Sequence, residues 1–271
     1  MLSQELVDFI NSGLPYSCLR LVYNQWDSEI LQQQVYALCF YNDFTVHDNT
    51  GKAEVYEKTV QFVIKELELD TTCMISAKVP ACDSEIRNSL DKSGFKLIEC
   101  YVEMEHTLRH IPPVTDANVI RPFHNADIPL LEKIAFESFT FDRFHMDPEI
   151  KKEYANISRS EWVKNACLGR ADFILVAEAD SRIIGFVIGV KKVTGSETTG
   201  RLDLIAVDRH YRKLKVGYDL TVEFLTRAKK KGYNSASVGT QAHNIPSLRL
   251  YEKTGFLMSS CSYTYHKHIT I

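Results

Sequence analysis

The alternation of apolar and polar residues predicts a regular series of strands and helices between residues 118 and 271. Short, largely apolar runs are typical of strands, and they occur at 119–122, 173–177, 183–190, 201–207, 235–240 and 256–269. Apolar residues three and four positions apart are typical of helices, and they follow Asp127, a capping box at 158–161, Val216 and Asn244. The predicted order is one strand, two helices, three antiparallel strands, and then helix, strand, helix and strand.

A stretch rich in proline and turn-forming residues separates the chain into two parts. It covers residues 110–118, contains Pro112 and Pro113, and interrupts the apolar periodicity on both sides. We therefore predict a first domain over 1–112 and a second domain over 118–271.

The two parts end in similar segments. Leu90-Asp-Lys-Ser-Gly-Phe95 resembles Tyr251-Glu-Lys-Thr-Gly-Phe256, and each is followed by a cysteine five residues after the Phe, Cys100 or Cys261. Each segment predicts a helix that ends at a glycine in the left-handed cap position and passes into a strand. A short match can arise by chance, but its position at the end of both parts favours two related modules.

Composition narrows the class of protein. The chain has 271 residues, of which 45% are hydrophobic and 25% charged, so it can bury a full core. A net charge of −3 argues against a nucleic acid or an anionic membrane as the main partner. No apolar stretch approaches the ~20 residues of a membrane span, and the first residues include acids but no basic region, so we expect a cytoplasmic protein. Seven scattered cysteines favour core thiols over disulfides or zinc sites.

A basic loop follows the predicted strand at 201–207 and leads into the helix that starts at Val216. Arg212, Lys213 and Lys215 carry positive charge, and a helix N-terminus offers unpaired N–H groups to an anion. The loop therefore predicts a phosphate site, although a basic loop before an amphipathic helix is also common on solvated surfaces.

The last predicted helix carries two polar residues on one face. Asn244 precedes Pro246, as expected at a helix start, and Tyr251 follows Asn244 by seven residues, about two turns. One interpretation is that both side chains contact a ligand. The alternative is a capping asparagine and a half-buried tyrosine.

Together these segments resemble the GCN5-related N-acetyltransferase (GNAT) superfamily over about residues 118–265. The loop is similar to the family pattern Arg/Gln-x-x-Gly-x-Gly/Ala at Arg212 and Gly217, with Lys215 in place of the first glycine. The helix matches Asn-x-x-Ala/Ser-x-x-x-Tyr-x-x-x-Gly-Phe through Asn244 and Tyr251. The resemblance implies an α/β (α+β) GNAT fold, with a central mixed, mostly antiparallel sheet flanked by helices. A smaller, degenerate GNAT-like N-terminal domain would precede it.

The same resemblance implies an N-acyltransferase that uses acyl-CoA (coenzyme A) as cosubstrate and no metal. The residues that would bind the coenzyme are Ile205, Ala206, Val207, Arg212, Lys213, Lys215, Val216, Gly217, Tyr218 and Asn244.

The implied reaction is the direct attack of an amine on a thioester. Tyr251 would lie beside the coenzyme sulfur as general acid, since a phenol with a pKa of ~10 can protonate a thiolate. The backbone N–H groups of Ala206 and Val207 would bind the carbonyl and the pantetheine arm. The proton acceptor for the amine stays open between Asp203, His243 and a chain of water molecules.

Within the superfamily, the chain resembles two-domain enzymes that acylate nucleotide-linked amino sugars. The similar segments are Trp26-Asp-Ser-Glu29, residues 139–147 and Thr240-Gln241. This similarity implies as acceptor a dideoxyamino sugar linked to a nucleotide, dTDP above all, in surface-glycan or O-antigen biosynthesis. It also implies a homodimer.

Three polar residues are candidates for binding this acceptor. Arg143 would pair with a diphosphate, and His145 and Gln241 would contact the acceptor itself. The alternative for Arg143 and His145 is an ion-pair network with Asp147 inside the loop. The alternative for Trp26 is a place in the core.

Two other functions stay open. A GNAT enzyme can act on a protein, a polyamine or another small amine, and a related protein can bind coenzyme A as a noncatalytic sensor. Away from this site, His266 and His268 share one face of the last strand like a pair of metal ligands. Without a third ligand in the sequence nearby, we predict an exposed strand there.

Overall fold

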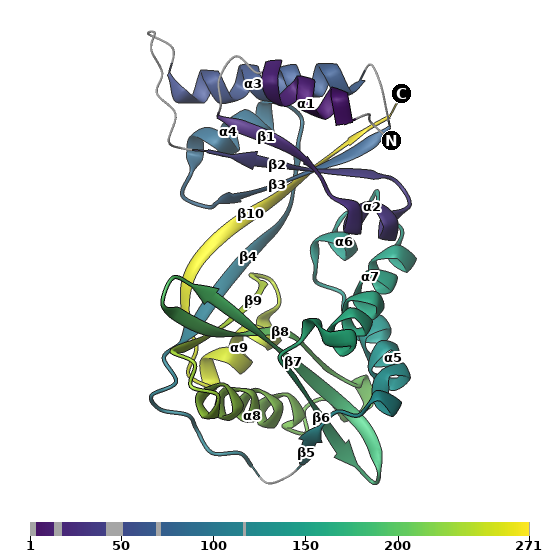
Figure 1. Ribbon diagram of the computed structural model, residues 1–271, viewed down its shortest axis with the longest axis vertical. Helices are drawn as coiled ribbons and strands as arrows, with labels where there is room; N and C mark the ends of the chain where they lie inside the picture. Colours follow the sequence, from purple (N-terminus) through teal and green to yellow (C-terminus); the bar gives the residue numbers. More distant parts are fainter. Residues whose placement is uncertain (1–3, 14–17, 42–50, 69–71, 116–117, 271) are drawn as a thin grey trace. The chain divides into compact units, whose positions relative to one another are not determined.

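The computed structural model describes residues 4–13, 18–41, 51–68, 72–115 and 118–270 (Figure 1). The chain divides into two compact units, and each unit is built from separate stretches of sequence. Unit 1 comprises Met1–Cys100, Met146–Lys151 and Cys261–Ile271. Unit 2 comprises Tyr101–His145 and Lys152–Ser260.

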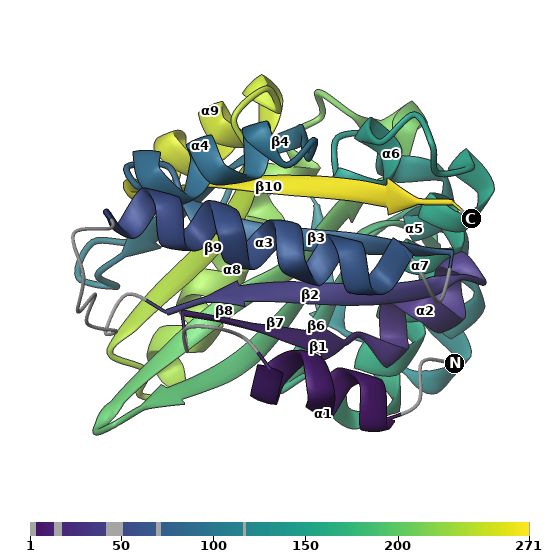
Figure 2. The same cartoon turned by 90° about the horizontal axis from the view of Figure 1, so that it is seen from above.

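Unit 1 packs helices on a sheet to which five strands contribute among the residues described, β4 and β10 with only part of their length. Figures 1 and 2 show α1 and α3 side by side over these strands, and Ile10 of α1 and Val60 of α3 are fully buried in their common core. The elements are α1 (Gln4–Gly13), β1 (Leu19–Tyr23), α2 (Gln25–Leu31), β2 (Gln34–Phe40), α3 (Lys52–Glu68), β3 (Cys73–Pro80), α4 (Ser84–Lys92), the start of β4 (Lys96–His106) and most of β10 (Leu257–Ile269).

Unit 2 has helices on both faces of its sheet. In β6, Ile174 packs with the α5 and α7 side and its neighbour Leu175 with the α8 and α9 side, as the alternation of a strand requires. Besides the rest of β4 and β10, its elements are β5 (Val119–Pro122), α5 (Ile128–Ser138), α6 (Arg143–Met146), α7 (Lys152–Asn165), β6 (Phe173–Ala179), β7 (Arg182–Thr194), β8 (Glu197–Val207), α8 (Val216–Lys230), β9 (Ser235–Gln241) and α9 (Ile245–Lys253).

The ten strands of the described residues form one mixed sheet in the order β1-β2-β3-β10-β4-β9-β8-β7-β6-β5. The pairs β2–β3 and β8–β9 are parallel. The pairs β1–β2, β3–β10, β4–β9, β5–β6, β6–β7 and β7–β8 are antiparallel. The predicted fold class is confirmed, and the predicted series of strands and helices after residue 118 is present, with the short helix α6 added.

The two compact units do not follow the division into consecutive parts before and after residues 110–118. Strand β4 runs from unit 1 into unit 2, and β10 runs from unit 2 back into unit 1. The last segment belongs to unit 1 because β10 pairs with β3 from Ser262↔Pro80 to Ile269↔Cys73. A break in apolar periodicity marks a connection, but it does not show which strands pair across it.

The similar segments of the two parts form the same local structure. Asp83 caps α4 by accepting a hydrogen bond from the Ile86 N–H, and Asn244 caps α9 through the Ser247 N–H. Each helix then ends at a glycine with positive φ, 75° for Gly94 and 95° for Gly255.

The hydrogen bonds after the two helices also correspond. The Phe95 N–H donates to the Leu90 carbonyl and the Phe256 N–H to the Tyr251 carbonyl, both at 3.0 Å. The strands that follow, β4 and β10, bring the sulfurs of Cys100 and Cys261 to 3.1 Å from each other. The two segments are therefore similar in structure as well as in sequence.

Two predicted side-chain caps are not formed, although α5 does begin directly after Asp127 as predicted. The Asp127 side chain does not cap α5, because it accepts instead from the His124 N–H and from the guanidinium of Arg121, at 2.7 Å each. Ser158 lies inside α7, which begins at Lys152, so the predicted capping box is not used. At Asp127 the hydrogen bond from Arg121 replaces the predicted cap, and at Ser158 the helix has already begun six residues earlier. In both places these contacts outweigh the local sequence signal.

The segment Trp26-Asp-Ser-Glu29 lies in α2, where its polar residues have structural contacts. Asp27 and Ser28 are buried: Asp27 accepts from the Asn24 side chain at 2.7 Å, and the Ser28 hydroxyl accepts from the Val35 N–H at 2.9 Å. Trp26 is half-buried. Among the helices of the described residues, none is long and apolar enough to cross a membrane.

Candidate functional site

The sheet of unit 2 opens between its two parallel strands. The β8–β9 pairing runs from Thr199↔Ser235 to Leu202↔Val238 and ends there, although β8 continues to Val207. Beyond this point β8 keeps its antiparallel partner β7, and β9 pairs with β4 through Tyr101↔Gln241. The last residues of β8 thus have an open edge toward β9 within the residues described.

The register of β8 shows which backbone groups face this opening. The Asp208 N–H donates to the Ile184 carbonyl on β7 at 2.9 Å, and in an antiparallel pair successive residues face opposite sides. The N–H groups of Val207 and Ile205 therefore point to the open edge. The N–H of Ala206 points to β7, opposite Phe186, so Ala206 is not a backbone donor at the opening as predicted.

A β-bulge precedes the open edge. Ile188 pairs with Leu204 and Gly189 with Leu202, which leaves Asp203 as the extra residue. The bulge changes the face of the sheet on which the side chains lie. Before it, Leu202 packs on the α8 side, and after it, Leu204 packs on the α5 and α7 side. The sequence did not reveal this change of face.

Asp203 lies at the bulge and is held by the helical side of the unit. One carboxylate oxygen, Oδ2, accepts from Trp162 Nε1 at 2.7 Å and pairs with an Arg170 amino group at 2.9 Å. The side chain is only 10% exposed. These contacts tie β8 to α7 and to the turn that follows it, which is a structural role in addition to the proposed role as a base.

The loop between β8 and α8 carries the predicted phosphate-binding residues. Arg212 donates to the carbonyls of Val207 and Ser138 at 3.3 Å each, which fixes the guanidinium beside the end of β8. Lys213 and Lys215 have positive φ, 66° and 63°, a conformation that costs a residue with a side chain roughly 1–2 kcal/mol. Lys215 thus adopts the left-handed backbone that the family pattern gives to glycine.

Helix α8 presents its N-terminus at this loop. No side chain caps the helix at Lys215, so the first N–H groups are available to an anion within the described structure. A Cβ on Gly217 would lie 3.4 Å from Leu250 and 3.8 Å from Val207, an ordinary contact. A methyl group at Gly217 would therefore fit against Leu250 and Val207 without displacing them. The side chains of Val216 and Tyr218 are turned elsewhere, into the core and toward the Pro113 carbonyl.

Asp219, in the first turn of α8, is a polar anchor that the sequence did not indicate. It is 1% exposed and accepts from the Thr115 N–H, the Thr115 hydroxyl and the Asn118 amide at 2.7–2.8 Å. These bonds hold the connecting segment before β5 against the start of α8.

The two polar residues of α9 differ in their surroundings. Asn244 is the helix cap, as the alternative interpretation held, and its amide donates to the Thr240 hydroxyl at 3.1 Å. Tyr251 is almost fully buried, with its ring 5.8 Å from that of Phe256, rather than half-buried. Burial raises the pKa of Tyr251, so its hydroxyl stays protonated at every ordinary pH. His243 is exposed, with its ring 5.5 Å from that of Phe141.

A second polar group lies on β4 and β8 and was missed by the sequence analysis. The Arg201 guanidinium donates to Glu103 and, at 2.8 Å, to the Tyr101 hydroxyl. A Cβ on Gly239 would lie 1.8 Å from the Tyr101 hydroxyl oxygen, so the tyrosine passes directly over this glycine of β9. Because β4 belongs to the first part of the sequence, no local pattern indicates this contact.

The residues predicted to bind the acceptor do not form one group. Gln241 lies at the end of β9 opposite Tyr101, and the Arg143 guanidinium lies 4.5 Å above the ring of Phe144. His145 is 6% exposed: Nδ1 bonds to Asp142 at 2.7 Å and Nε2 to Asn156 at 2.8 Å. With both ring nitrogens bonded inside the protein, His145 supports the loop and does not contact a substrate.

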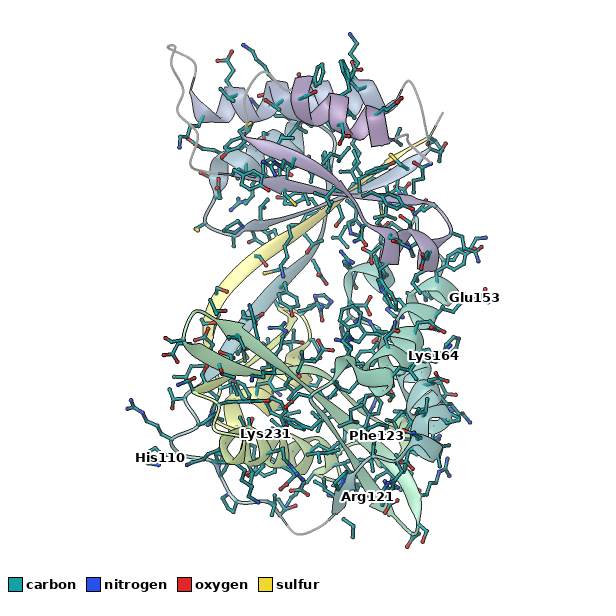
Figure 3. All side chains as sticks on the ribbon, in the orientation of Figure 1. His110, Arg121, Phe123, Glu153, Lys164 and Lys231 are labelled. Carbon is teal, nitrogen blue, oxygen red and sulfur yellow. The ribbon has the colours of Figure 1, made fainter. Side chains whose placement is uncertain are left out.

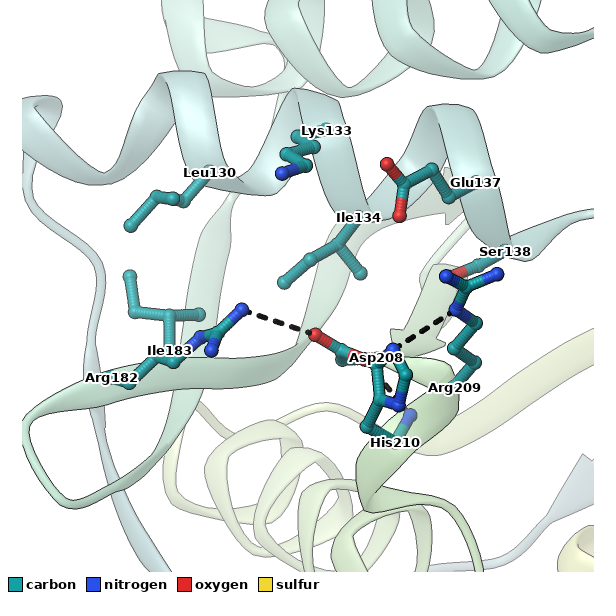
Figure 4. A pocket seen from close by; sticks show the side chains of 10 residues that line it. All are labelled: Leu130, Lys133, Ile134, Glu137, Ser138, Arg182, Ile183, Asp208, Arg209 and His210. Carbon is teal, nitrogen blue, oxygen red and sulfur yellow. Dashed lines mark hydrogen bonds and ion pairs between the residues drawn. The ribbon is translucent and has the colours of Figure 1, made fainter.

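A pocket of about 190 Å³ lies between α5 and the turn after β8 (Figure 4). Lys133, Arg182, Arg209 and His210 contribute basic groups to its lining, and Asp208 pairs with Arg182 at 3.9 Å. The residues that line it include none of those predicted to bind coenzyme or acceptor.

Comparison with known proteins identifies the fold with a family. Residues 131–256, which include the bulge, the open edge, the loop and α9, match the Acetyltransferase (GNAT) family. The chain therefore contains a domain of the GNAT acetyltransferase family. A GNAT enzyme transfers an acetyl group from acetyl-CoA, so acetyl-CoA is the expected cosubstrate.

Two relatives resemble most of this GNAT chain. The spore coat polysaccharide biosynthesis protein SpsD of Bacillus subtilis is 25% identical over 245 residues, which is 89% of this chain and 80% of SpsD. The dTDP-fucosamine acetyltransferase of Escherichia coli O6:H1 is 25% identical over 190 residues, 70% of this chain and 79% of that enzyme. Among solved structures, a tandem GNAT protein from the clavulanic acid biosynthesis pathway matches 88% of this chain and 76% of its own, with a TM-score of 0.55 and 13% identity.

The Asp142–His145 pair generates a prediction about stability and pH. Although burial opposes its charge, Arg159 and His145 hold the pKa of Asp142 well below its usual value. Burial also opposes the charged ring of His145, but the hydrogen bond to Asp142 raises the pKa of His145. The ion pair therefore stabilises the fold below the ordinary histidine pKa of ~6.5 and loses this contribution as pH rises through the higher folded value.

We expect His145→Gln to lower the free energy of unfolding by about 1–3 kcal/mol at pH 5.5 and by less at pH 9. Urea unfolding at both pH values measures the difference. His110→Gln is the control, because His110 is exposed on the connecting segment of the same unit and should change stability at neither pH (Figure 3). An equal loss at pH 5.5 and pH 9 would show that the imidazolium is not what stabilises the loop.

Proposed function

We propose that this GNAT acetyltransferase transfers an acyl group from acyl-CoA to the amino group of a nucleotide-linked amino sugar. The observation that carries the proposal is the extent of the similarity to SpsD, a polysaccharide biosynthesis protein. That similarity covers 89% of the chain and so extends well beyond the GNAT match. The similarity to a dTDP-fucosamine acetyltransferase supports a nucleotide-linked amino sugar as the acceptor.

The open edge of β8 and the start of α8 fit the coenzyme. Val207 and Ile205 offer N–H groups along the opening, and α8 offers an uncapped N-terminus with no side chain at Gly217. Arg212, Lys213 and Lys215 add positive charge beside that N-terminus, where a pyrophosphate would be held. Acyl-CoA supplies the thioester whose acyl group is transferred.

In the proposed mechanism Tyr251 donates a hydrogen bond to the leaving sulfur. Its raised pKa keeps the hydroxyl protonated, and full proton transfer to a thiolate with a pKa of ~8.5 is uphill, so stabilisation of the developing charge is its main contribution. The N–H groups of Ile205 and Val207 hold the chain of the cosubstrate in place. Asp203, at the bulge beside the opening, and the exposed His243 stay the proposed proton acceptors for the amine.

The acceptor side of the proposal rests on Arg143 and Gln241. Arg143 carries the guanidinium that would pair with the diphosphate, and Gln241 lies at the end of β9, where β9 is parted from β8. Tyr101, Glu103 and Arg201 form the polar group next to Gln241 and extend the surface on which an acceptor amine would lie.

Replacement of Gly217 tests the coenzyme cradle. Gly217→Ala fits beside Leu250 without displacement and should slightly stabilise α8, but its methyl group would fill the space at the helix N-terminus. We expect the KM for acetyl-CoA to rise about tenfold or more while the protein stays folded. Gly51→Ala is the matched control, because nothing lies within 4 Å of a Cβ there. An unchanged KM in Gly217→Ala would place the pyrophosphate elsewhere.

Replacement of Tyr251 tests the proposed donor. In Tyr251→Phe the ring keeps its packing against Phe256 and only the hydroxyl is lost, so we expect kcat to fall about 100-fold or more with little change in the KM for acetyl-CoA. Because burial raises the pKa of Tyr251, the wild-type rate should show no decline from tyrosine ionisation below pH 10. A variant with unchanged kcat would eliminate Tyr251 from the mechanism.

The acceptor is tested by the release of free CoA thiol from acetyl-CoA, and then from longer acyl-CoAs. Acceptors would be TDP- and UDP-linked amino sugars, with a polyamine and a lysine peptide as comparison amines. We expect turnover with one nucleotide sugar, loss of that turnover in Arg143→Ala, and none with the comparison amines. Turnover with a polyamine or peptide alone would replace the sugar assignment. Coenzyme binding without turnover on any amine would identify a noncatalytic sensor.

A further inference from the structure

Two histidines and one aspartate meet inside unit 1, outside the candidate functional site. His266 and His268 lie on β10, and Asp147 lies in the segment Met146–Lys151, which belongs to the same unit. The oxygen Oδ2 of Asp147 is 2.6 Å from His266 Nδ1 and 2.8 Å from His268 Nε2. The three potential ligand atoms all lie within 4.8 Å of one another.

This cluster overturns the expectation of an exposed strand. The His266 side chain is 0% exposed, Asp147 is 2% and His268 is 14%. Strand alternation places both imidazoles on one face of β10, where His266 and His268 stand opposite Ser76 and Met74 of β3. The third group comes from 119 residues earlier in the chain, which is why the sequence alone showed only two.

We propose that Asp147, His266 and His268 bind a divalent transition-metal ion, Zn²⁺ in the first place. Two imidazole nitrogens and one carboxylate oxygen are a donor set that zinc accepts, with a water molecule as fourth ligand of a tetrahedron. Zinc bonds of about 2.0–2.2 Å place such ligand atoms roughly 3.3 Å apart. On binding, Oδ2 of Asp147 would therefore move about 0.7 Å away from His266 Nδ1 and about 0.5 Å away from His268 Nε2.

The surroundings hold the carboxylate ready for this role. The second oxygen of Asp147, Oδ1, accepts from the Glu149 N–H at 2.9 Å, and the Ile150 N–H donates to the Asp147 carbonyl at 3.2 Å. The turn is further held by an ion pair of 2.8 Å between Glu149 and Lys96 of β4. Oδ1 is thus occupied by the turn and Oδ2 faces both imidazoles, the arrangement by which neighbouring groups orient a metal ligand.

The site would have a structural role. None of its three residues lies at the open edge of β8, in the basic loop or in α9, so the metal takes no part in the proposed acyl transfer. It would instead fasten the segment Met146–Lys151 to β10 within unit 1, and it would add metal-binding free energy to the stability of that unit.

The experiment uses the full chain, stripped of metal with a chelator and then titrated with Zn²⁺ in a calorimeter and with Co²⁺ in a spectrophotometer. We expect one ion per chain, the visible absorption bands of four-coordinate Co²⁺, and a higher melting temperature with Zn²⁺. His268→Gln and Asp147→Asn should each weaken Zn²⁺ binding about tenfold or more and abolish the rise in melting temperature. His110→Gln, which changes an exposed histidine, should leave the stoichiometry and affinity unchanged.

The two variants keep the test independent of folding. His268 is the more exposed histidine, and Asp147→Asn keeps the shape of the carboxylate, so at least one is expected to fold; circular dichroism without metal identifies which. Binding of less than one ion per wild-type chain would overturn the proposal. Equal binding by the wild type and the folded variants would overturn it as well. The cluster would then be a hydrogen-bonded anchor and not a metal site.

Discussion

The parting of β8 from β9 is the constraint on which the arrangement of unit 2 depends. Past Leu202↔Val238 the strand β8 keeps one neighbour, so the N–H groups of Ile205 and Val207 face an opening instead of a strand. Backbone groups rarely remain without a partner, and an extended ligand with its own amide groups can complete such an edge as an added strand would. The opening is thus made by the topology of the sheet and not by any particular side chain.

Different contacts hold the strands on the two sides of the opening. On the β8 side, the bulge at Asp203 is fixed by Trp162 and Arg170. On the β9 side, Tyr101 of β4 crosses Gly239 to reach Arg201. A side chain at residue 239 would displace that tyrosine, so the glycine is required by the close approach of its neighbour. The carboxylate of Asp203, a candidate base in the sequence, is therefore also engaged in holding one side of the opening.

The sequence predicted the parts of the structure that depend on local periodicity. The strands after residue 118, the helix with its stripe of apolar residues after Val216 and the asparagine cap of α9 each follow from spacing within a few turns of chain. The contact of Asp203 with Trp162 and the Tyr101–Arg201 contact join residues 41 and 100 positions apart, and no local pattern contains them. The partners of His145, Asp142 and Asn156, are only 3 and 11 residues away, but their spacing does not show that they bind both ring nitrogens. Lys215 is an intermediate case, since the family pattern has a glycine at this position and the structure shows a φ of 63° there.

The internal similarity explains why the chemistry is proposed for only one of the two similar segments. The same cap, the same glycine turn and the same Phe N–H bond build α4 with β4 and α9 with β10. At corresponding places, however, Leu90 stands where the second segment has Tyr251, and both side chains are buried. Burial of a leucine adds only apolar packing, whereas burial of a tyrosine places a protonated hydroxyl inside the protein, where its hydrogen bonds are stronger than in water. The local fold is the same in both segments because it depends on the caps and glycines, and the hydroxyl to which the proposed chemistry is assigned is present only in the second.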